Sequence, residues 1–311
     1  MVVGSLYAGV GGICKGFMNA GFEIGWANEY DKFACQTYRD NFTHKLFEGD
    51  IWELEPESLP KIDVLAGGFP CQPFSIAGYR KGFEDERGNH FFRITKFISV
   101  LNPNVVFLEN VKNLMGHDKG NTFLVIKDTL EQFGYDVFHK VLNTKNITQI
   151  PQNRERIIIV AFKKELEVKF TFPEKKEEDL EYINVIDNKV DDEKYFYREG
   201  KYNFNQLKER VTNPFTFYQW RRQYVRENKS GVCPTLTANM GTGGHNVPII
   251  LTKKGIRKLT PRECFNLQGF PSDFKLPNIS NSHLYKQSGN SVTVPLIEMV
   301  AREIKSCLAK S

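Results

Sequence analysis

The chain has 311 residues, of which 41% are hydrophobic and 25% charged, and its formal net charge is +5. These values are typical of a globular protein with one large or two modest domains, and they exclude a largely disordered, collagen-like or coiled-coil chain. The longest purely apolar run, Ile157 to Phe162, is too short to cross a membrane. No basic residue precedes the apolar start of the chain. We therefore expect a cytoplasmic protein with no membrane contact and no signal peptide.

Apolar runs and segments with helical spacing alternate through the first half of the chain. We expect strands at Val2–Tyr7, Phe22–Asn28, Ile62–Ala66, Val105–Leu108, Val137–Leu142 and Ile157–Phe162. Helices are expected from the first glycine turn through Ala20 and at Asp31–Asn41, His90–Leu101 and Phe123–Phe133. Alternating strands and helices with continuous apolar strands predict an α/β fold with a doubly wound, mostly parallel sheet.

The second half has a different pattern. Lys163 to Arg210 is rich in charges of both signs and reads as a solvated connector. From Pro214 to Arg262 the charges become one-sided, with nine basic residues and one acidic residue. The last segment, Pro295 to Leu308, has the apolar spacing of an amphipathic helix.

Cysteine and histidine residues are scattered along the chain. The six cysteines include no C-x-x-C pair, and the six histidines include no H-x-x-x-H pair. Without ligand pairs of this kind we expect no metal site and free thiols.

A glycine turn follows the first expected strand, at Gly9 to Gly12. Such a turn lets a ligand approach the backbone at the start of a helix. Cys14 stands where a dinucleotide fingerprint has its third glycine, which weakens an NAD assignment. Glu29 and Asp50 follow later strand regions, where carboxylates could hold a ribose and an adenine amine. The alternative is a plain strand-to-helix turn with surface acids.

Three further segments carry side chains suited to catalysis. Cys71 lies in a glycine- and proline-rich turn after a central strand, where a thiolate could act as a nucleophile, although a free cysteine is more often inert packing. Glu109 directly follows an apolar strand and is either an exposed end or a desolvated acid. Arg154 and Arg156 are two apart, so a strand would place them on one face, or they form a surface ion-pair ladder.

Together these segments resemble the cytosine-C5 DNA methyltransferases that use S-adenosylmethionine, and specifically their compact bacterial modification enzymes. The matching pieces, in the family's order, are Tyr7–Gly12, Asn28–Glu29, Gly49–Asp50, Gly68–Ser75, Glu109–Val111, Gln152–Arg156, Arg257–Cys264, Gln268–Pro271 and Gly289–Val292. The departures are Tyr7, where the family often has Phe, and Phe69, where it often has Pro. Both keep the local shape.

The resemblance implies a role for each matching residue. Cys71 would add to cytosine C6, Glu109 would contact N3 and the exocyclic amine, and Arg154 and Arg156 would hold the carbonyl and a phosphate. The implied cofactor site comprises Tyr7, Gly9, Gly11, Gly12, Glu29, Tyr30, Asp50, Ile51, Pro70, Asn290 and Ser291. The implied substrate is a cytosine flipped out of double-stranded DNA.

Residues expected to contact DNA fall in two regions. The segment Gln72–Asn89 combines glycines with basic residues, which suits a loop that closes on DNA, although a mobile surface loop fits too. The basic segment Pro214–Arg262 would recognise the target. The DNA-binding candidates are Ser75, Arg80, Lys81, Arg87, Arg221, Arg222, Arg226, Thr235, Gly241 and Gly243.

The expected organisation is a discontinuous catalytic and cofactor domain, residues 1–172 plus 284–311, and a smaller irregular target-recognition domain, residues 173–283. We expect a monomer that protects host DNA, with a possible partner restriction endonuclease acting on the same site. Two other functions are compatible with the motifs: an RNA cytosine methyltransferase on the same scaffold, and a non-catalytic DNA-binding protein with an inactive cofactor pocket.

Overall fold

The computed structural model describes residues 1–70, 90–174, 184–200, 204–221, 223–229, 231–242 and 246–310. The chain divides into two compact units. The first unit comprises Met1–Leu142, Glu155–Glu174 and Pro295–Ser311, and the second comprises Asn143–Arg154 and Lys175–Val294.

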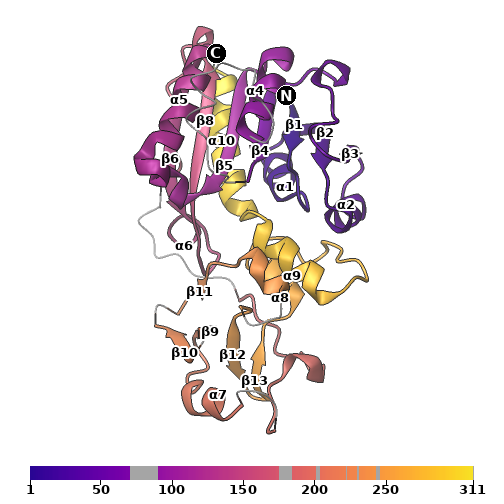
Figure 1. Ribbon diagram of the computed structural model, residues 1–311, viewed down its shortest axis with the longest axis vertical. Coiled ribbons are helices and arrows are strands. Elements are labelled where there is room, and N and C mark those ends of the chain that lie inside the picture. Colours follow the sequence, from indigo (N-terminus) through magenta and orange to yellow (C-terminus); the bar gives the residue numbers. More distant parts are fainter. Residues whose placement is uncertain are drawn as a thin grey trace. The chain divides into compact units, whose positions relative to one another are not determined.

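A seven-stranded sheet forms the centre of the first unit, with the strand order β3-β2-β1-β4-β5-β8-β6 (Figure 1). The strands are β1 (Val2–Leu6), β2 (Glu23–Glu29), β3 (Lys45–Glu48), β4 (Val64–Gly68), β5 (Val105–Val111), β6 (Tyr135–Asn143) and β8 (Glu155–Lys163). Strands β1 to β5 pair in parallel, whereas β8 runs antiparallel to β5. The predicted doubly wound, mostly parallel sheet is therefore confirmed.

Helices cover both faces of this sheet. They are α1 (Gly12–Asn19), α2 (Lys32–Arg39), α4 (His90–Leu101), α5 (Asn121–Gln132) and α10 (Val294–Leu308). On one face, α4 and α5 pack into a core with β-strand residues such as Leu65 and Val106. On the other face, Phe17 of α1 lies edge-on to Phe107 of β5, at 5.3 Å between ring centroids. Short 3-10 turns connect these elements at Pro56–Ser58, Lys112–Met115, His117–Gly120 and Lys164–Leu166.

The strand order places a binding site at one position of the sheet. The chain winds outward in one direction from β1 and in the other from β4, and these two strands are neighbours. Open α/β sheets bind ligands beyond the carboxyl ends of the strands at such a reversal. The segment after β1 begins at Tyr7 and the segment after β4 begins at Phe69, so the glycine turn and the approach to Cys71 both lie at this edge.

The second unit contains a four-stranded sheet in the order β10-β9-β12-β13. Its strands are β9 (Phe217–Arg221), β10 (Tyr224–Asn228), β12 (Ile249–Thr252) and β13 (Gly255–Lys258). Two short strands, β7 (Gln152–Asn153) and β11 (Cys233–Pro234), pair in parallel. The helices are α6 (Thr144–Ile147), α7 (Phe204–Arg210), α8 (Pro261–Asn266) and α9 (Asn281–Asn290), with 3-10 turns at Glu193–Tyr195 and Ala238–Gly241.

Strands β9 and β10 form a hairpin with two unlike faces. Tyr218, Trp220 and Val225 pack into a small core that also contains Leu207 of α7. Because strand residues alternate, the residues between them project from the opposite face. Gln219 and Arg226 are direct cross-strand partners on that second face.

The division of the chain differs from the expected domain boundaries. Residues 143–154 and 284–294 belong to the second unit, although we expected them in the catalytic domain. The chain leaves the first sheet at the end of β6, pairs β7 with β11, and returns as β8. None of the helices in the described part of the chain has the length and apolar character needed to span a bilayer.

Candidate active site

Glu109 and Arg156 form an ion pair near the carboxyl end of strand β5, in the first sheet. The Arg156 Nε atom lies 2.9 Å from Glu109 Oε1, and the two side chains are 13% and 11% exposed. Strand pairing explains the contact, because Glu109 faces Ile158 across the antiparallel β5–β8 ladder and Arg156 is two residues away on the same face. Two opposite charges with so little solvent around them attract each other more strongly than they would in bulk water.

The same carboxyl group borders the end of β4. Gly68 is the parallel partner of Glu109, and a Cβ on Gly68 would lie 3.4 Å from Glu109 Oε2. Because Gly68 has no side chain, Glu109 Oε2 faces the segment that leads to Cys71. Asn110 Nδ2 donates to the Phe69 carbonyl at 2.9 Å and fixes the start of that segment. Cys71 itself lies outside the described residues.

The turn after β1 has backbone angles that a side chain disfavours. Gly9 and Gly11 have φ angles of +57° and +86°. A Cβ at Gly11 would lie 2.2 Å from the Phe42 ring, whereas a Cβ at Gly9 would meet no atom within 4 Å. Gly12 begins α1 directly afterwards. The turn therefore presents bare backbone to open space on its Gly9 side, as a bound nucleoside requires.

Glu29 connects this turn to the end of β2. Its Oε2 accepts from the Gly9 N–H at 2.8 Å, and its Oε1 accepts from the N–H groups of Tyr30 and Asp31 at 3.0 and 2.8 Å. Burial raises the pKa of Glu29, although these three hydrogen bonds oppose the shift. A carboxylate has about four lone-pair positions, so one remains for a ligand hydroxyl.

Tyr30 and Asp50 complete the polar edge near the turn. Tyr30 is 71% exposed, which makes its ring available for stacking. Asn28 Nδ2 donates to the carbonyls of Phe47 and Gly49 at 3.0 and 3.1 Å, and so fixes the chain just before Asp50. Asp50 is exposed, whereas the predicted cofactor residue Ile51 is buried and its carbonyl accepts from Arg93 Nε.

Tyr7 makes a contact that phenylalanine could not make. Its hydroxyl lies 3.0 Å from His90 Nδ1, and the two rings meet edge-on. Burial and the nearby Asp50 carboxylate raise the pKa of Tyr7, so it stays a neutral hydrogen-bonding group. Tyr7, Gly9, Glu29, Tyr30 and Asp50 together provide bare backbone, an aromatic face and carboxylates, a set that fits an adenosine with a free ribose.

The other predicted cofactor residues are more dispersed. Pro70 is exposed beyond β4. Asn290 and Ser291 belong to the second unit, at the C-terminal end of α9, whereas the remaining predicted cofactor residues belong to the first.

Arg154 lies in a different environment from Arg156. Arg154 lies between β7 and β8 and belongs to neither strand, so the continuous strand that we expected through Arg154 and Arg156 is interrupted. Arg154 is only 2% exposed, and its guanidinium donates to the carbonyls of Leu236, Gly289 and Ser291. Arg156 belongs to the first unit and Arg154 to the second.

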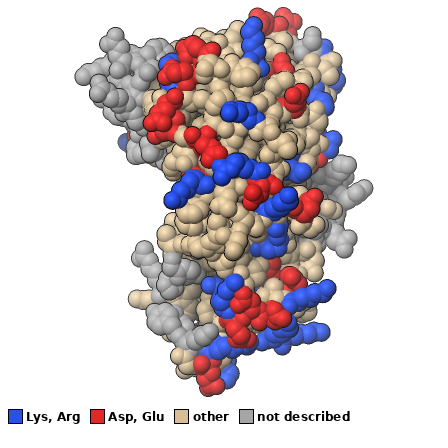
Figure 2. Space-filling view, turned by 90° about the vertical axis from the view of Figure 1, so that its right-hand side faces the viewer, with Lys and Arg blue, Asp and Glu red and all other residues tan. Residues whose placement is uncertain are grey.

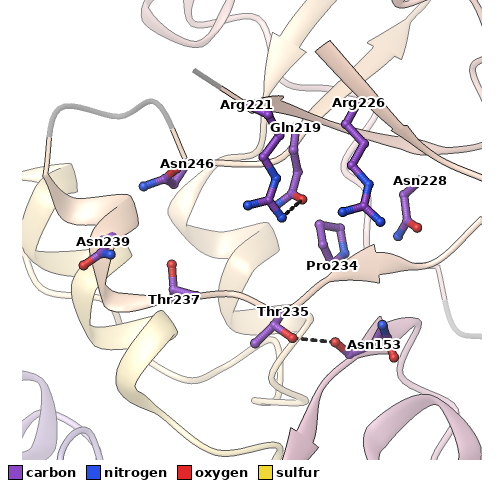
Figure 3. Close-up of a pocket in the computed structure, with 10 residues that line it drawn as sticks. All are labelled: Asn153, Gln219, Arg221, Arg226, Asn228, Pro234, Thr235, Thr237, Asn239 and Asn246. Carbon is purple, nitrogen blue, oxygen red and sulfur yellow. Dashed lines mark hydrogen bonds between the residues drawn. The ribbon is translucent and has the colours of Figure 1, made fainter. Parts of the chain in front are cut away.

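A polar cavity of about 370 Å³ opens on the second unit (Figure 3). It is lined by Asn153, Gln219, Arg221, Arg226, Asn228, Pro234, Thr235, Thr237, Asn239 and Asn246. Three of the predicted DNA contacts, Arg221, Arg226 and Thr235, are thus brought together. Arg221 Nη2 donates to Gln219 Oε1 at 3.1 Å, which orients its guanidinium. Gly241 packs against Ser282 of α9 and does not line the cavity.

The basic segment Pro214–Arg262 does not form a uniformly basic surface in the folded second unit. Arg257 is buried with Glu263 at 2.7 Å, and Lys254 Nζ donates to the carbonyls of Lys189 and Val190. Arg198 pairs with Glu193 on the same unit. On the face in Figure 2, acidic and basic side chains lie next to one another on the second unit. Trp220, an aromatic residue of the same segment, packs against the small core.

Seven predicted site residues lie outside the described residues: Cys71, Ser75, Arg80, Lys81, Arg87, Arg222 and Gly243. Conversely, the structure adds Asn110, His90, Gln152 and Gln219, which sequence reasoning missed. A buried amide next to a strand end was the available signal for Asn110. In the described part of the chain, His, Cys, Asp and Glu form no group of three or more suited to a metal ion.

Comparisons with known proteins decide the family. The family model described as "C-5 cytosine-specific DNA methylase" matches residues 1–306. This chain belongs to that family. The methyltransferase is 57% identical to the Type II methyltransferase M.Bsp6I of Bacillus sp., over 97% of this chain and 98% of that protein. It is 38% identical to the Type II methyltransferase M.HhaI of Haemophilus parahaemolyticus, over 97% and 94% of the two chains.

Solved structures support the fold. The methyltransferase superposes on a prophage-encoded E. coli protein described as a "putative DNA modification methyltransferase", with a TM-score of 0.73 at 22% identity, covering 99% of each chain. It superposes on the S. pombe Dnmt2 methyltransferase with a TM-score of 0.73 at 18% identity, covering 100% and 99%. The predicted enzyme class is thus confirmed: the protein is a DNA cytosine-5-methyltransferase of a family that depends on S-adenosylmethionine.

Proposed function

We propose that the Glu109–Arg156 pair, together with Cys71, forms the catalytic centre that methylates a cytosine flipped out of duplex DNA. The main support is the 2.9 Å contact between Arg156 Nε and Glu109 Oε1, which leaves Glu109 Oε2 facing Gly68 at the end of β4. Cys71 follows that strand end by three residues. A target base between the thiol and the carboxyl would be contacted on both sides.

The chemistry proceeds through a covalent adduct. The Cys71 thiolate adds to C6, and a proton shared between Glu109 Oε2 and N3 stabilises the electrons displaced into the ring. C5 thereby becomes nucleophilic and takes the methyl group, a base removes the C5 proton, and Cys71 leaves. Bound S-adenosylmethionine would supply the electrophilic methyl group, and S-adenosylhomocysteine would be the product that leaves. Arg156 would hold Glu109 in place and lie near the cytosine carbonyl.

The cofactor site we propose is the edge formed by Tyr7, Gly9, Glu29, Tyr30 and Asp50. The carboxylate of Glu29 would accept from the ribose, Asp50 would accept from the adenine amine, and Tyr30 would stack near the adenine. Gly11, Gly12, Ile51 and Pro70 would complete the first unit's share of the site, and Asn290 and Ser291 would contribute at the methionine end.

The cavity of the second unit is our candidate for target recognition. Arg221 and Arg226 have the donors that pair with guanine edges, and Gln219 and Asn228 have amides that pair with adenine. Thr235 would lie near the DNA backbone at the target. The predicted contacts Ser75, Arg80, Lys81, Arg87, Arg222, Gly241 and Gly243 remain part of this proposal.

The biological role we infer is protection of host DNA, since M.Bsp6I and M.HhaI are named Type II methyltransferases. A partner endonuclease acting on the same site, action as a monomer and a cytoplasmic location at the DNA belong to the same inference. Bisulfite sequencing of DNA from cells that express the protein would identify the methylated cytosine and its sequence context.

One experiment tests the catalytic assignment. Cys71→Ser should abolish methyl transfer but leave S-adenosylmethionine binding nearly intact. The unchanged protein should form a stable adduct with duplex DNA containing 5-fluorocytosine, because fluorine cannot leave as the C5 proton does. Turnover by the variant, no trapped adduct, or preference for transfer RNA over DNA would contradict the proposal.

We also propose that no metal takes part, because the thiolate activates a carbon and no water needs activation by an ion. Methyl transfer should survive EDTA. Loss of activity that one particular metal restores would refute this.

A further inference from the structure

The segment 235–241 of the second unit, which carries Thr235, Thr237 and Asn239 into the cavity, is held by side chains from residues 152–154. The Leu236 N–H donates to Gln152 Oε1 at 3.1 Å, and the Leu236 carbonyl accepts from Arg154 Nη1 at 2.8 Å. Thr235 Oγ1 donates to the Asn153 carbonyl at 2.6 Å (Figure 3). Both backbone groups of Leu236 are therefore bonded by side chains.

The side chains of residues 152–154 alternate between buried and exposed, and this alternation explains the arrangement. Asn153 is exposed and lines the cavity, whereas Gln152 and Arg154 on either side of it are 0% and 2% exposed. Strand β7 pairs with β11, and the Cys233 N–H donates to the Pro151 carbonyl at 2.7 Å. The cavity wall and the buried side chains that hold it thus come from consecutive residues.

Helix α9 supports the segment from another side. A Cβ on Gly289 would lie 2.1 Å from the Thr237 carbonyl carbon, so the helix packs directly against the backbone there. The Gly289 and Ser291 carbonyls accept from Arg154 Nη2. One guanidinium therefore joins residue 236 to the end of α9.

We propose that Arg154 is a positioning residue for target recognition and does not contact the substrate. Its guanidinium donates to three main-chain carbonyls and is sealed from solvent, whereas a phosphate or base contact needs an exposed donor. Through Leu236 it sets the position of Thr235 and Thr237 on the cavity wall. This inference rests on the proposed function, in which that wall meets DNA.

The test compares Arg154→Met with Arg154→Lys in the full-length protein. Arg154→Met keeps the aliphatic stem and removes the hydrogen bonds, so the KM for DNA should rise about 10- to 100-fold, as expected for lost charged hydrogen bonds. The rate of methyl transfer at saturating DNA should be nearly unchanged. Hydrogen–deuterium exchange of residues 233–241 should become faster, and Arg154→Lys should recover part of both effects.

The matched control is Arg156→Gln, which should lower the rate at saturating DNA and leave exchange at 233–241 unchanged. Thr235→Val combined with Arg154→Met should cost less than the sum of the two, because both act through the same segment. If Arg154→Met behaves like Arg156→Gln, with a slower saturated rate and unaltered exchange, Arg154 contacts the substrate and the proposal is wrong.

A second variant and a second readout distinguish a folding defect and a failure of the proposed function from a failure of this inference. If Arg154→Met does not fold, Gln152→Met leaves Arg154 in place and removes the acceptor for the Leu236 N–H, together with the Gln152 Nε2 bonds to the Leu267 carbonyl and Gln268 Oε1. It should give the same faster exchange and higher KM. If the unchanged protein forms no adduct with DNA, the proposed function fails, but the exchange measurement still decides whether Arg154 holds residues 233–241.

Discussion

The carboxyl group of Glu109 and the guanidinium of Arg156 meet at 2.9 Å because the antiparallel pairing of β5 with β8 makes them diagonal neighbours on one face. In a sheet whose other determined pairings are parallel, this one reversed strand brings a basic side chain to the edge where β4 and β5 end. The acid that we propose as catalytic is therefore oriented by a strand that comes later in the chain.

Replacing Glu109 by Gln should abolish most of the activity. The amide keeps the shape but removes both the charge that Arg156 holds and the proton-donating group, so methyl transfer should fall about 10²- to 10⁴-fold. Single-turnover transfer to duplex DNA would measure this, with S-adenosylmethionine binding as the control. An equal loss of cofactor affinity would indicate a structural role for Glu109.

Breaking the buried pair of Arg257 and Glu263 should strongly destabilise the second unit. The two side chains are 1% and 0% exposed and share two hydrogen bonds, and Glu263 also accepts from the Thr260 and Asp187 N–H groups. Glu263→Gln leaves a buried charge unpaired and should cost about 3–5 kcal/mol of unfolding free energy.

Urea denaturation would measure that loss. The matched control is Glu298→Gln, which breaks the more exposed Glu298–Arg302 pair of α10 and should cost about 0–1 kcal/mol. Similar losses in the two variants would show that burial does not decide the strength of these pairs.

Glu29 should make both stability and cofactor binding depend on pH. Burial raises its pKa in the folded protein, so the fold binds this proton more tightly than the unfolded chain does. Stability should therefore fall as the pH rises from the ordinary glutamate range through the raised pKa. Glu29→Gln should remove that fall.

Cofactor binding should show the opposite dependence. The ionised carboxylate is the better acceptor for ribose hydroxyls, so S-adenosylmethionine affinity should increase with pH over the same interval. Calorimetry at several pH values would measure it, with Glu29→Gln as the reference. A pH profile that is the same in both proteins would refute the assignment.

Arg221 and Arg226 should contact base edges and so discriminate between sequences, whereas Lys253 should contact only the phosphate backbone. Replacing the arginine that contacts guanine by Ala should cost about 1–3 kcal/mol on the cognate site and much less on scrambled DNA. Gln219→Met should also reduce discrimination, because it frees the Arg221 guanidinium and removes an amide that we propose for adenine edges.

Lys253→Ala is the control and should weaken binding to both duplexes equally, with a salt dependence reduced by about one counterion. We choose Lys253 because Lys254 is already bonded to main-chain carbonyls. If the arginine variants lose the same affinity on both duplexes, they contact phosphates, and specificity lies elsewhere in the second unit.

The sequence predicted most of the first sheet because its strands are continuous apolar runs: β5 begins at the expected residue, and β8 begins two residues before it. It predicted Glu29, Asp50 and Glu109 at strand ends for the same reason. It did not predict the surroundings of Arg154, because the expected strand is not continuous there: β7 pairs with β11, and β8 begins at Glu155. The partners of Asn110 and Gln152 were also unpredictable, because they come from distant segments.

In the β9–β10 hairpin, one set of alternate residues packs against the core and the other set lines the cavity. Tyr218, Trp220 and Val225 attach the hairpin to the core, and Gln219, Arg221 and Arg226 face the cavity. Substitutions at the second set leave the packing of the first set intact. If the cavity recognises the target, as we propose, a few changes on one side of two strands should alter the methylated sequence without a new scaffold. A library randomised at those positions is then the starting point for engineering altered methylation sites.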